Sequence, residues 1–229
     1  MKNLGKIILH IPAREGSKRV PRKNMRDMNG KPMISYAIES SIKANITKDI
    51  YINTDSYEII NYTKLNYPSF KIYKRDDYLA SDKVQSDEFN YDIIRNLQAD
   101  TLIMINPVCP LITPNDIRNA FELYKKSDCD TLITSTSTQM QTFCEKEPVN
   151  IDLNVPLAPS QDNKVITTLN WAITIWDATK FKKRMEQKGY ASLGENRLLF
   201  DIDAIHAVKV SEEKDFLLAE LIINVRKGK

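Results

Sequence analysis

The stretch that decides the fold is Lys6–Asn24, KIILHIPAREGSKRVPRKN. Its first six residues, Lys6–Ile11, form a short apolar run that ends at Pro12, which is typical of a strand buried inside a sheet. The loop that follows is strongly cationic. Five basic side chains fall within ten positions: Arg14, Lys18, Arg19, Arg22 and Lys23. In open α/β sheets, ligands bind beyond the carboxyl ends of strands, so this loop predicts an anion site there.

Any phosphate site in this chain must work with little glycine. The chain has only six glycines in 229 residues, and one of them, Gly16, lies in the basic loop. Neither G-x-x-x-x-G-K-[ST] nor G-x-G-x-x-G occurs. Phosphate would therefore be held by lysine and arginine side chains. The alternative interpretation is a solvated basic loop, and the position directly after the leading strand favours the ligand site.

Strands and helices alternate over the first 135 residues. Apolar runs predict further strands at Asp49–Asn53, Phe70–Tyr73, Thr101–Ile105 and Thr131–Ser135. Helical spacing predicts helices at Pro32–Ala44, from Thr54, at Gln85–Leu97 and from Thr113 to Lys126. This alternation is typical of parallel βαβ units, so we expect an α/β fold with a doubly wound, mostly parallel sheet and helices on both faces.

The pattern changes at about residue 138. Gln139–Asn163 is polar and contains prolines, and an apolar stretch follows at Val165–Trp176. We expect a small antiparallel insertion over about 138–195 that builds a dimer contact, inside a single domain spanning 1–229. The chain then returns to a predicted strand at Ile205–Val210 and a helix from Glu212 to about Arg226.

Composition excludes several classes of protein. The chain is 42% hydrophobic and carries 33 basic against 30 acidic residues, a net charge of +3 that points neither to disorder nor to a nucleic-acid partner. No apolar run reaches the roughly 20 residues of a membrane helix, and the start does not read as a signal peptide. Three scattered cysteines are too few for a disulfide framework or a zinc site. We expect a cytoplasmic protein with no membrane partner.

The segment Ile11–Asn24 resembles the opening motif I-P-A-R-x-x-S-K-x-x-P-x-K-N of the acylneuraminate cytidylyltransferases, the CMP-sialic acid synthetase family. Four further segments resemble family motifs in the same order along the chain: Asn53–Asp55 (S-T-D), Arg75–Ser86 (R-P-x-x-L-A-x-D and a serine), Asn106–Leu111 (Q-P-T-S-P-L) and Asp215–Glu220 (D-x-x-x-A-E). The resemblance implies a Rossmann-like nucleotidyltransferase fold. It also implies an enzyme that couples CTP to a sialic-acid-like 2-keto sugar acid, forming a CMP-sugar and pyrophosphate.

The same resemblance implies roles for individual residues. Arg14, Lys18 and Lys23 are the expected catalytic cations, which offset charge on the departing pyrophosphate. The expected nucleotide-binding residues are Ala13, Arg14, Ser17, Lys18, Asn24, Arg75, Val84 and Ser86, the last three near the cytosine. The expected acceptor-binding residues are Asn106, Gln161 and Asn170.

The metal site departs from the family pattern. The family places two aspartates of D-I-D-T before the final helix, whereas this chain has Lys209 and Ser211 there. An ammonium and a hydroxyl cannot replace a pair of hard oxygen ligands. Mg²⁺ is still the expected cofactor, and three arrangements stay open. Asp201 and Asp203 supply the ligands, the triphosphate holds the ion, or Lys209 replaces its charge.

The acceptor side departs as well. Val108 and Cys109 stand where the family has threonine and serine, Trp171 stands where a glycine is usual, and no arginine lies between Arg118 and Arg184. Two alternatives follow, a cytidylyltransferase with a non-sialic acceptor and a non-catalytic nucleotide-binding relative. The expected partners are CTP, a small acidic sugar and a second copy of the chain in a homodimer.

Overall fold

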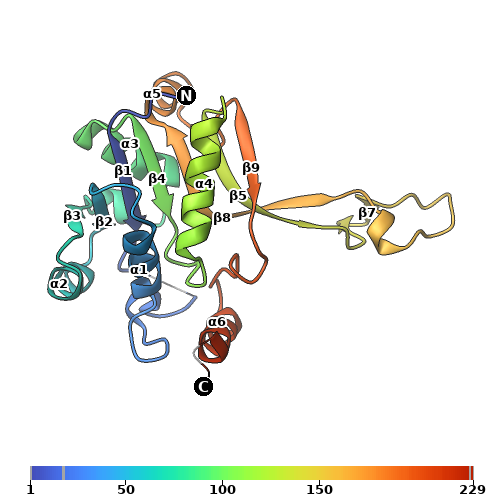
Figure 1. Cartoon of the computed structure of the whole chain (residues 1–229), viewed down its shortest axis with the longest axis horizontal. Coiled ribbons are helices and arrows are strands. Elements are labelled where there is room, and N and C mark those ends of the chain that lie inside the picture. The colour runs from blue at the N-terminus through green and yellow to red at the C-terminus, as the bar shows by residue number, and fades with distance from the viewer. Residues whose placement is uncertain (1, 17–18, 227, 229) are drawn as a thin grey trace.

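The computed structural model describes residues 2–16, 19–226 and 228. Within these residues, seven strands form one sheet in the order β3-β2-β1-β4-β8-β5-β9 (Figure 1). Their bounds are β1 Ile7–Pro12, β2 Ile50–Thr54, β3 Lys71–Lys74, β4 Thr101–Ile105, β5 Thr131–Thr138, β8 Ile166–Asp177 and β9 Arg197–Asp201. Only β8 runs antiparallel to its neighbours in this described sheet. The predicted mostly parallel sheet is confirmed.

Helices cover both faces of this sheet. They are α1 Ile34–Ala44, α2 Tyr57–Asn66 and α4 Pro114–Lys126 on one face, and α3 Ser86–Leu97 and α5 Ala178–Lys188 on the other. The last helix, α6 Glu213–Arg226, packs in a separate cluster against Val20, Met28 and Leu111. Side chains alternate across β1, so Leu9 packs with α1 and α4 on one face and Ile8 packs with α3 and α5 on the other. None of the helices in the described part of the chain has the length and apolar character needed to cross a membrane.

Helix α4 shows how the local sequence sets an element. The Thr113 hydroxyl accepts the Asp116 N–H at 3.2 Å, and the Asp116 carboxylate accepts the Thr113 N–H at 2.8 Å. This reciprocal capping box, with Pro114 in the first turn, starts the helix where the sequence predicted it. The preceding strand β4 is buried along its whole length, which places its carboxyl end firmly in the middle of the sheet.

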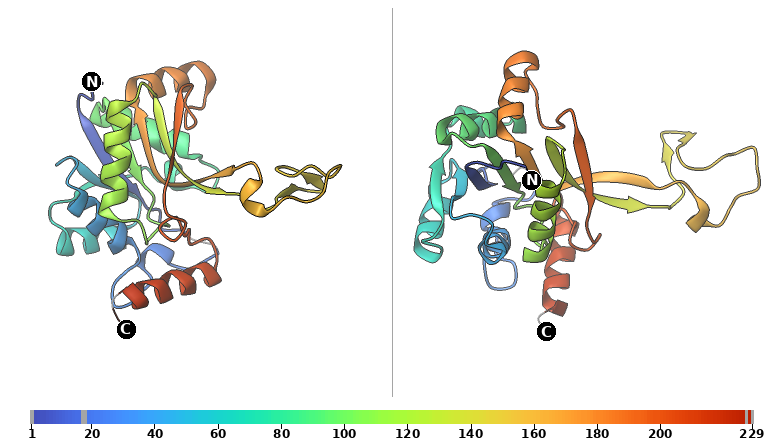
Figure 2. Two further views of the ribbon diagram at one scale, coloured as in Figure 1. Left: turned by 45° about the vertical axis from the view of Figure 1, so that its right-hand side comes forward. Right: turned by 45° about the horizontal axis from the view of Figure 1, so that its top comes forward.

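Residues 138–195, predicted as one antiparallel insertion, contain an antiparallel ribbon, a strand of the main sheet and a helix. β5 and β8 run beyond the sheet as an antiparallel ribbon, the arm (residues 136–168), whose tip carries β6 Phe143–Cys144 and β7 Glu147–Pro148 (Figures 1 and 2). The second half of β8 enters the main sheet between β4 and β5. Helix α5 then follows against the sheet.

The predicted strand at Ile205–Val210 is wrong. The last strand is instead β9, an edge strand whose side chains alternate between half-buried and exposed, which weakens its apolar signal in the sequence. Residues 204–207 form a turn, because the Asp203 carboxylate accepts the Ile205 N–H at 2.7 Å and the Asp203 carbonyl accepts the Ala207 N–H at 3.0 Å. The apolar residues of this segment therefore pack into the core from a turn and a loop, not from a strand.

Candidate functional site

A cavity of about 620 Å³, the main cavity, opens at the carboxyl ends of β1 and β4. It is lined by Pro12, Arg14, Arg75, Ser86, Asp87, Phe89, Met104, Asn106, Trp171, Arg184, Tyr190, Ser192, Leu193, Arg197 and Lys209. Because β2 and β3 lie on one side of β1 while β4 lies on the other, the strand order reverses here. Open α/β sheets bind ligands at this switch point.

A second cavity, the basic cavity, adjoins the main cavity and has a volume of about 340 Å³. It is lined by Pro12, Arg14, Gly16, Arg19, Lys23, Asn24, Asn106, Pro107 and Val108. The Lys23 ammonium donates to the Val210 carbonyl at 2.8 Å. Burial, followed by repulsion from Arg19, Lys209 and Arg14, lowers the pKa of Lys23. This concentration of positive charge, where the triphosphate was predicted, suits a polyanion.

Arg75 is the most firmly held cation of the main cavity. It is 3% exposed, and its guanidinium donates to the Asn53 side-chain oxygen at 2.8 Å and to the Asn53 carbonyl at 3.1 Å. The guanidinium carbon lies 4.4 Å from the centre of the Phe89 ring. Burial lowers the pKa of Arg75 to about 10, so the group stays charged at neutral pH. Ser86, the first residue of α3, brings its hydroxyl to the same cavity.

The other predicted nucleotide residues gather around the end of β1. The Arg14 guanidinium pairs with Asp82 at 2.7 Å, and the Asn24 side chain donates to the Arg14 carbonyl at 3.3 Å. Ala13 is buried, and its N–H donates to the Asn53 carbonyl. Val84 donates its N–H to the Ser81 carbonyl in the loop before α3. Ser17 and Lys18 lie outside the described residues.

Of the predicted acceptor residues, Asn106 lines both cavities. Asn170 is buried and lines neither cavity. Its side-chain oxygen accepts the Thr134 hydroxyl at 2.6 Å and the Ala172 N–H at 3.1 Å. Gln161 lies in the short 3₁₀ helix Ser160–Asp162 of the arm, where its carbonyl accepts the Gln139 amide. Within one chain, the structure brings Asn106 alone of these three residues to the cavities described above.

Trp171 reaches the main cavity because β8 is irregular at this point. The pairing of β5 with β8 shifts register between Ile133 and Ser135, and Trp171 adopts a φ of 59°, in the left-handed region that favours glycine. A glycine, which the resemblance led us to expect at this position, would adopt this conformation more easily than a tryptophan. The other tryptophan, Trp176, is buried and donates its indole N–H to the Ser192 carbonyl at 2.8 Å.

The sequence interpretation missed two arginines of the main cavity, Arg184 and Arg197. Arg184 comes from α5 and pairs with Glu195 at 2.9 Å. Arg197 begins β9 and donates to the carbonyls of Leu193 and Gly194. No motif marks either residue. They reach the cavity because β8 returns through the sheet and carries α5 back beside α3.

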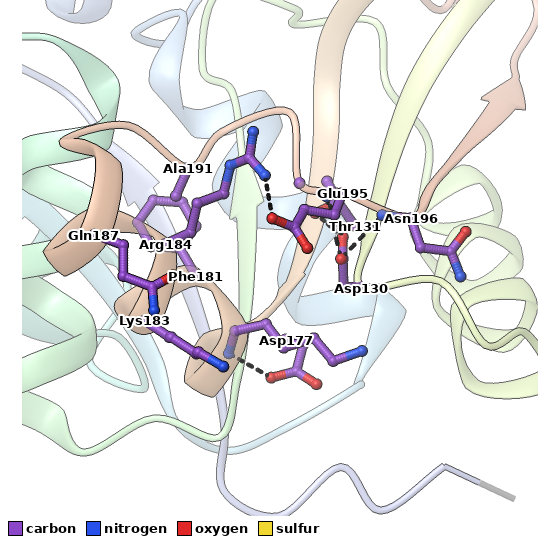
Figure 3. Close-up of a pocket in the computed structure, with 12 residues that line it drawn as sticks. Asp130, Thr131, Asp177, Phe181, Lys183, Arg184, Gln187, Ala191, Glu195 and Asn196 are labelled. Atoms are coloured by element: carbon purple, nitrogen blue, oxygen red, sulfur yellow. Dashed lines mark hydrogen bonds and ion pairs between the residues drawn. The ribbon is translucent and has the colours of Figure 1, made fainter.

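Arg184 also borders a smaller cavity of about 320 Å³ (Figure 3). The carboxylates of this cavity are already bonded within the protein. Asp130 accepts the N–H groups of Glu195 and Asn196, and Asp177 accepts the Lys180 N–H at 3.0 Å as the cap of α5. The polar groups of this smaller cavity therefore serve mainly to connect α5, β5 and the segment before β9.

The residues present do not fit a carboxylate-held divalent cation. Asp201 accepts the Ser135 hydroxyl at 3.4 Å, Asp203 accepts the Ile205 N–H, and neither is among the residues that line the main or the basic cavity. Within residues 2–16, 19–226 and 228, no three His, Cys, Asp or Glu side chains are grouped so that they could hold a metal ion. Mg²⁺ prefers several hard oxygen ligands in octahedral geometry. The Asp201–Asp203 metal pair stays a prediction.

Comparison with known proteins identifies relatives of this chain. A family model described as "Cytidylyltransferase" matches residues 8–182. "Post-translational flagellin modification protein B" of Campylobacter coli is 30% identical over 96% of both chains. A pseudaminic acid cytidylyltransferase of Campylobacter jejuni is 35% identical over 59% of both chains. The structure of a CMP:2-keto-3-deoxy-manno-octonic acid synthetase with CTP matches 97% of this chain and 100% of its own, with a TM-score of 0.67. At 14% identity it supports the fold alone.

Proposed function

Because the chain belongs to the cytidylyltransferase family, we propose that this nucleotidyltransferase transfers CMP from CTP to a nine-carbon 2-keto sugar acid of the sialic acid type. The main support for this proposal is that the main cavity and the basic cavity meet at Arg14, which lines both. A cation-rich cavity sized for phosphates adjoins a larger one with polar and aromatic walls at the switch point of the sheet. A relative named pseudaminic acid cytidylyltransferase supports the acceptor class.

The proposed reaction is a displacement at phosphorus. The anomeric hydroxyl oxygen of the acid attacks the α-phosphorus of CTP, and the bond from that phosphorus to the bridging oxygen of the β-phosphate breaks. The hydroxyl proton goes to solvent, and pyrophosphate leaves with the bonding electrons. Such reactions depend mostly on positioning and on neutralising developing charge. Arg14 and Lys23 supply that charge from the basic cavity.

Recognition of the base is assigned to Arg75 and Ser86. Cytosine presents a carbonyl acceptor and an amino donor, which require a donor and an acceptor in fixed positions. The buried Arg75 guanidinium is held by Asn53 and supplies the donor. The Ser86 hydroxyl, 3.4 Å from the Ser192 hydroxyl, supplies the acceptor.

The acidic nature of the acceptor is supported by the charge of the main cavity. Arg184, Arg197 and Lys209 line it, and Asp87 is the carboxylate among its described lining residues. Asp87 is occupied, because it accepts the Ser192 N–H at 2.7 Å. A second candidate is a smaller acceptor, and the Trp171 ring, which narrows the cavity where a glycine would leave space, favours it.

We extend the proposal to a homodimer built through the arm. The arm exposes large apolar side chains that a monomer would leave in water: Met140, Phe143, Leu153, Val155, Leu157 and Val165. Dimerisation would bury them, and it offers a function for Gln161, which lies far along the arm. The cytoplasmic location and the Mg²⁺ cofactor stay predictions.

A pyrophosphate-release screen tests the proposed function. The intact chain is mixed with CTP, UTP, ATP or GTP and with N-acetylneuraminic acid, pseudaminic acid, shorter 2-keto acids or simple alcohols. We expect release with CTP and a nine-carbon acid, and at least tenfold less with an Arg14→Ala variant. Lys64→Ala, at an exposed position on α2, is the matched control. CTP binding without turnover of any nine-carbon acid would contradict the acceptor assignment.

A further inference from the structure

The segment from Lys209 to Ser211 lies between the two cavities and the core under α6. Val210 is fully buried and packs with Phe216 of α6. Its N–H donates to the Val108 carbonyl at 2.8 Å, and its carbonyl accepts the Lys23 ammonium at 2.8 Å. Lys209 is exposed beside this fixed point and lines the main cavity. The backbone therefore holds Lys209 in a defined position next to the basic cavity.

Lys209 differs from the arginines of the main cavity in lacking a partner. Arg75 bonds to Asn53, Arg14 to Asp82, Arg184 to Glu195 and Arg197 to two carbonyls. The Lys209 ammonium makes no hydrogen bond or ion pair with any residue of 2–16, 19–226 or 228. Its three donors are free for a ligand.

The surroundings of Lys209 are those of an anion site, and the nearby Asp215 carboxylate is already bonded to the Ser211 and Glu212 N–H groups. Arg14, Arg19 and Lys209 all lie near enough to Lys23 for their charges to repel it. The carboxylate among the described lining residues of both cavities is Asp87, which accepts backbone N–H groups. A divalent cation brought here would meet positive charge on several sides and no oxygen pair from the protein.

We propose that Lys209 contacts the phosphate charge of CTP directly and supplies the neutralisation that a carboxylate-held divalent cation would otherwise supply. The identity of the nucleotide rests on the proposed function. Arg14, Arg19 and Lys23 supply the remaining positive charge, since the single ammonium of Lys209 carries half the charge of a divalent ion. The consequence is that this chain binds CTP without a divalent cation.

Isothermal titration of CTP into the intact protein, in EDTA and in excess Mg²⁺, tests this proposal without any acceptor. The Kd of the unmodified chain is expected to differ by less than about threefold between the two conditions, and Lys209→Ala to weaken binding about tenfold in EDTA. Lys209→Asp combined with Ser211→Asp installs a carboxylate pair. This double variant is expected to bind CTP poorly in EDTA and to recover when Mg²⁺ is added.

Controls separate this result from misfolding and from the proposed function. Lys64→Ala makes the same charge change as Lys209→Ala outside both cavities and is expected to bind like the unmodified chain. Circular dichroism of each variant checks folding. A loss of more than about threefold in affinity when EDTA is added to the unmodified chain would overturn the proposal. So would Mg²⁺-dependent binding that Asp201→Asn or Asp203→Asn abolishes. In both cases the proposed transfer reaction would stand. Absence of CTP binding in both conditions would overturn both proposals.

Discussion

Arg75 and Asn53 form a two-point contact at the carboxyl edge of the sheet. The Arg75 Nε donates to the Asn53 Oδ1 at 2.8 Å, and its Nη2 donates to the Asn53 carbonyl at 3.1 Å. Both residues are buried, although Arg75 also lines the main cavity. A buried charge is costly unless its donors are bonded, so Asn53 holds the guanidinium in a fixed orientation toward the ligand.

Asn53→Ala removes one of these acceptors. We expect the free energy of unfolding to fall by about 1.5–3 kcal/mol, the range for a hydrogen bond to a charged group. Urea unfolding checks this, with Asn61→Ala on the exposed face of α2 as the control. CTP affinity should fall in the same variant. Unchanged stability and unchanged affinity would show that Asn53 does not position Arg75.

The two tryptophans give an optical readout of the main cavity. Trp171 lines the cavity, whereas Trp176 is buried and bonded to Ser192. We expect CTP to change the tryptophan emission of the unmodified chain and to leave the emission of Trp171→Phe unchanged. A full response in Trp171→Phe would place the ligand away from this ring.

Lys23 is predicted to act on the outer phosphates. Lys23→Ala should weaken CTP binding about tenfold or more and CMP binding much less, because CMP lacks the β- and γ-phosphates that the basic cavity would hold. Calorimetric titrations of CTP and CMP into the unmodified chain and into Lys23→Ala measure how much the Kd of each nucleotide rises. Lys48→Ala, at an exposed position before β2, is the control. Equal losses for CTP and CMP would contradict a triphosphate role for this cavity.

His10 makes folding sensitive to acid. It is fully buried in β1, and burial, reinforced by the charge of Arg75, lowers its pKa from 6.5 to about 3. Between these values the unfolded chain binds a proton that the folded chain does not, so stability is lost as the pH falls below about 6.5. His10→Gln should flatten the dependence of unfolding free energy on pH by up to roughly 1.4 kcal/mol per unit. Urea unfolding between pH 4.5 and 7.5 measures both slopes, and parallel curves would contradict this assignment.

The parallel core was predictable because its strands are buried on both faces. Such strands read as continuous apolar runs, as at Thr101–Ile105, and are separated by helices with clear caps such as Thr113. β9 was missed because an edge strand needs few apolar residues. The turn at 204–207 could not be read from the sequence, since its hydrogen bonds depend on Asp203 rather than on a hydrophobic period.

The candidate site was predictable where it follows single strands. Arg14, Lys23 and Asn24 lie in the segment that follows β1, Arg75 comes directly after β3, and strand ends meet at one edge of a parallel sheet. Arg184 and Arg197 were not predictable, because their approach to Ser86 and Phe89 depends on the antiparallel return of β8. The burial of Asn170 likewise depends on the irregular pairing beside Thr134.

The proposed reaction joins the CMP group of CTP to a nine-carbon 2-keto sugar acid. ³¹P nuclear magnetic resonance of the intact protein with CTP and pseudaminic acid or N-acetylneuraminic acid tests it most directly. We predict that the three CTP phosphorus signals are replaced by one phosphodiester signal and one pyrophosphate signal, with the two products in equal molar amounts. Persistence of the CTP signals with both acids, under conditions in which CTP binding is measured, would contradict it.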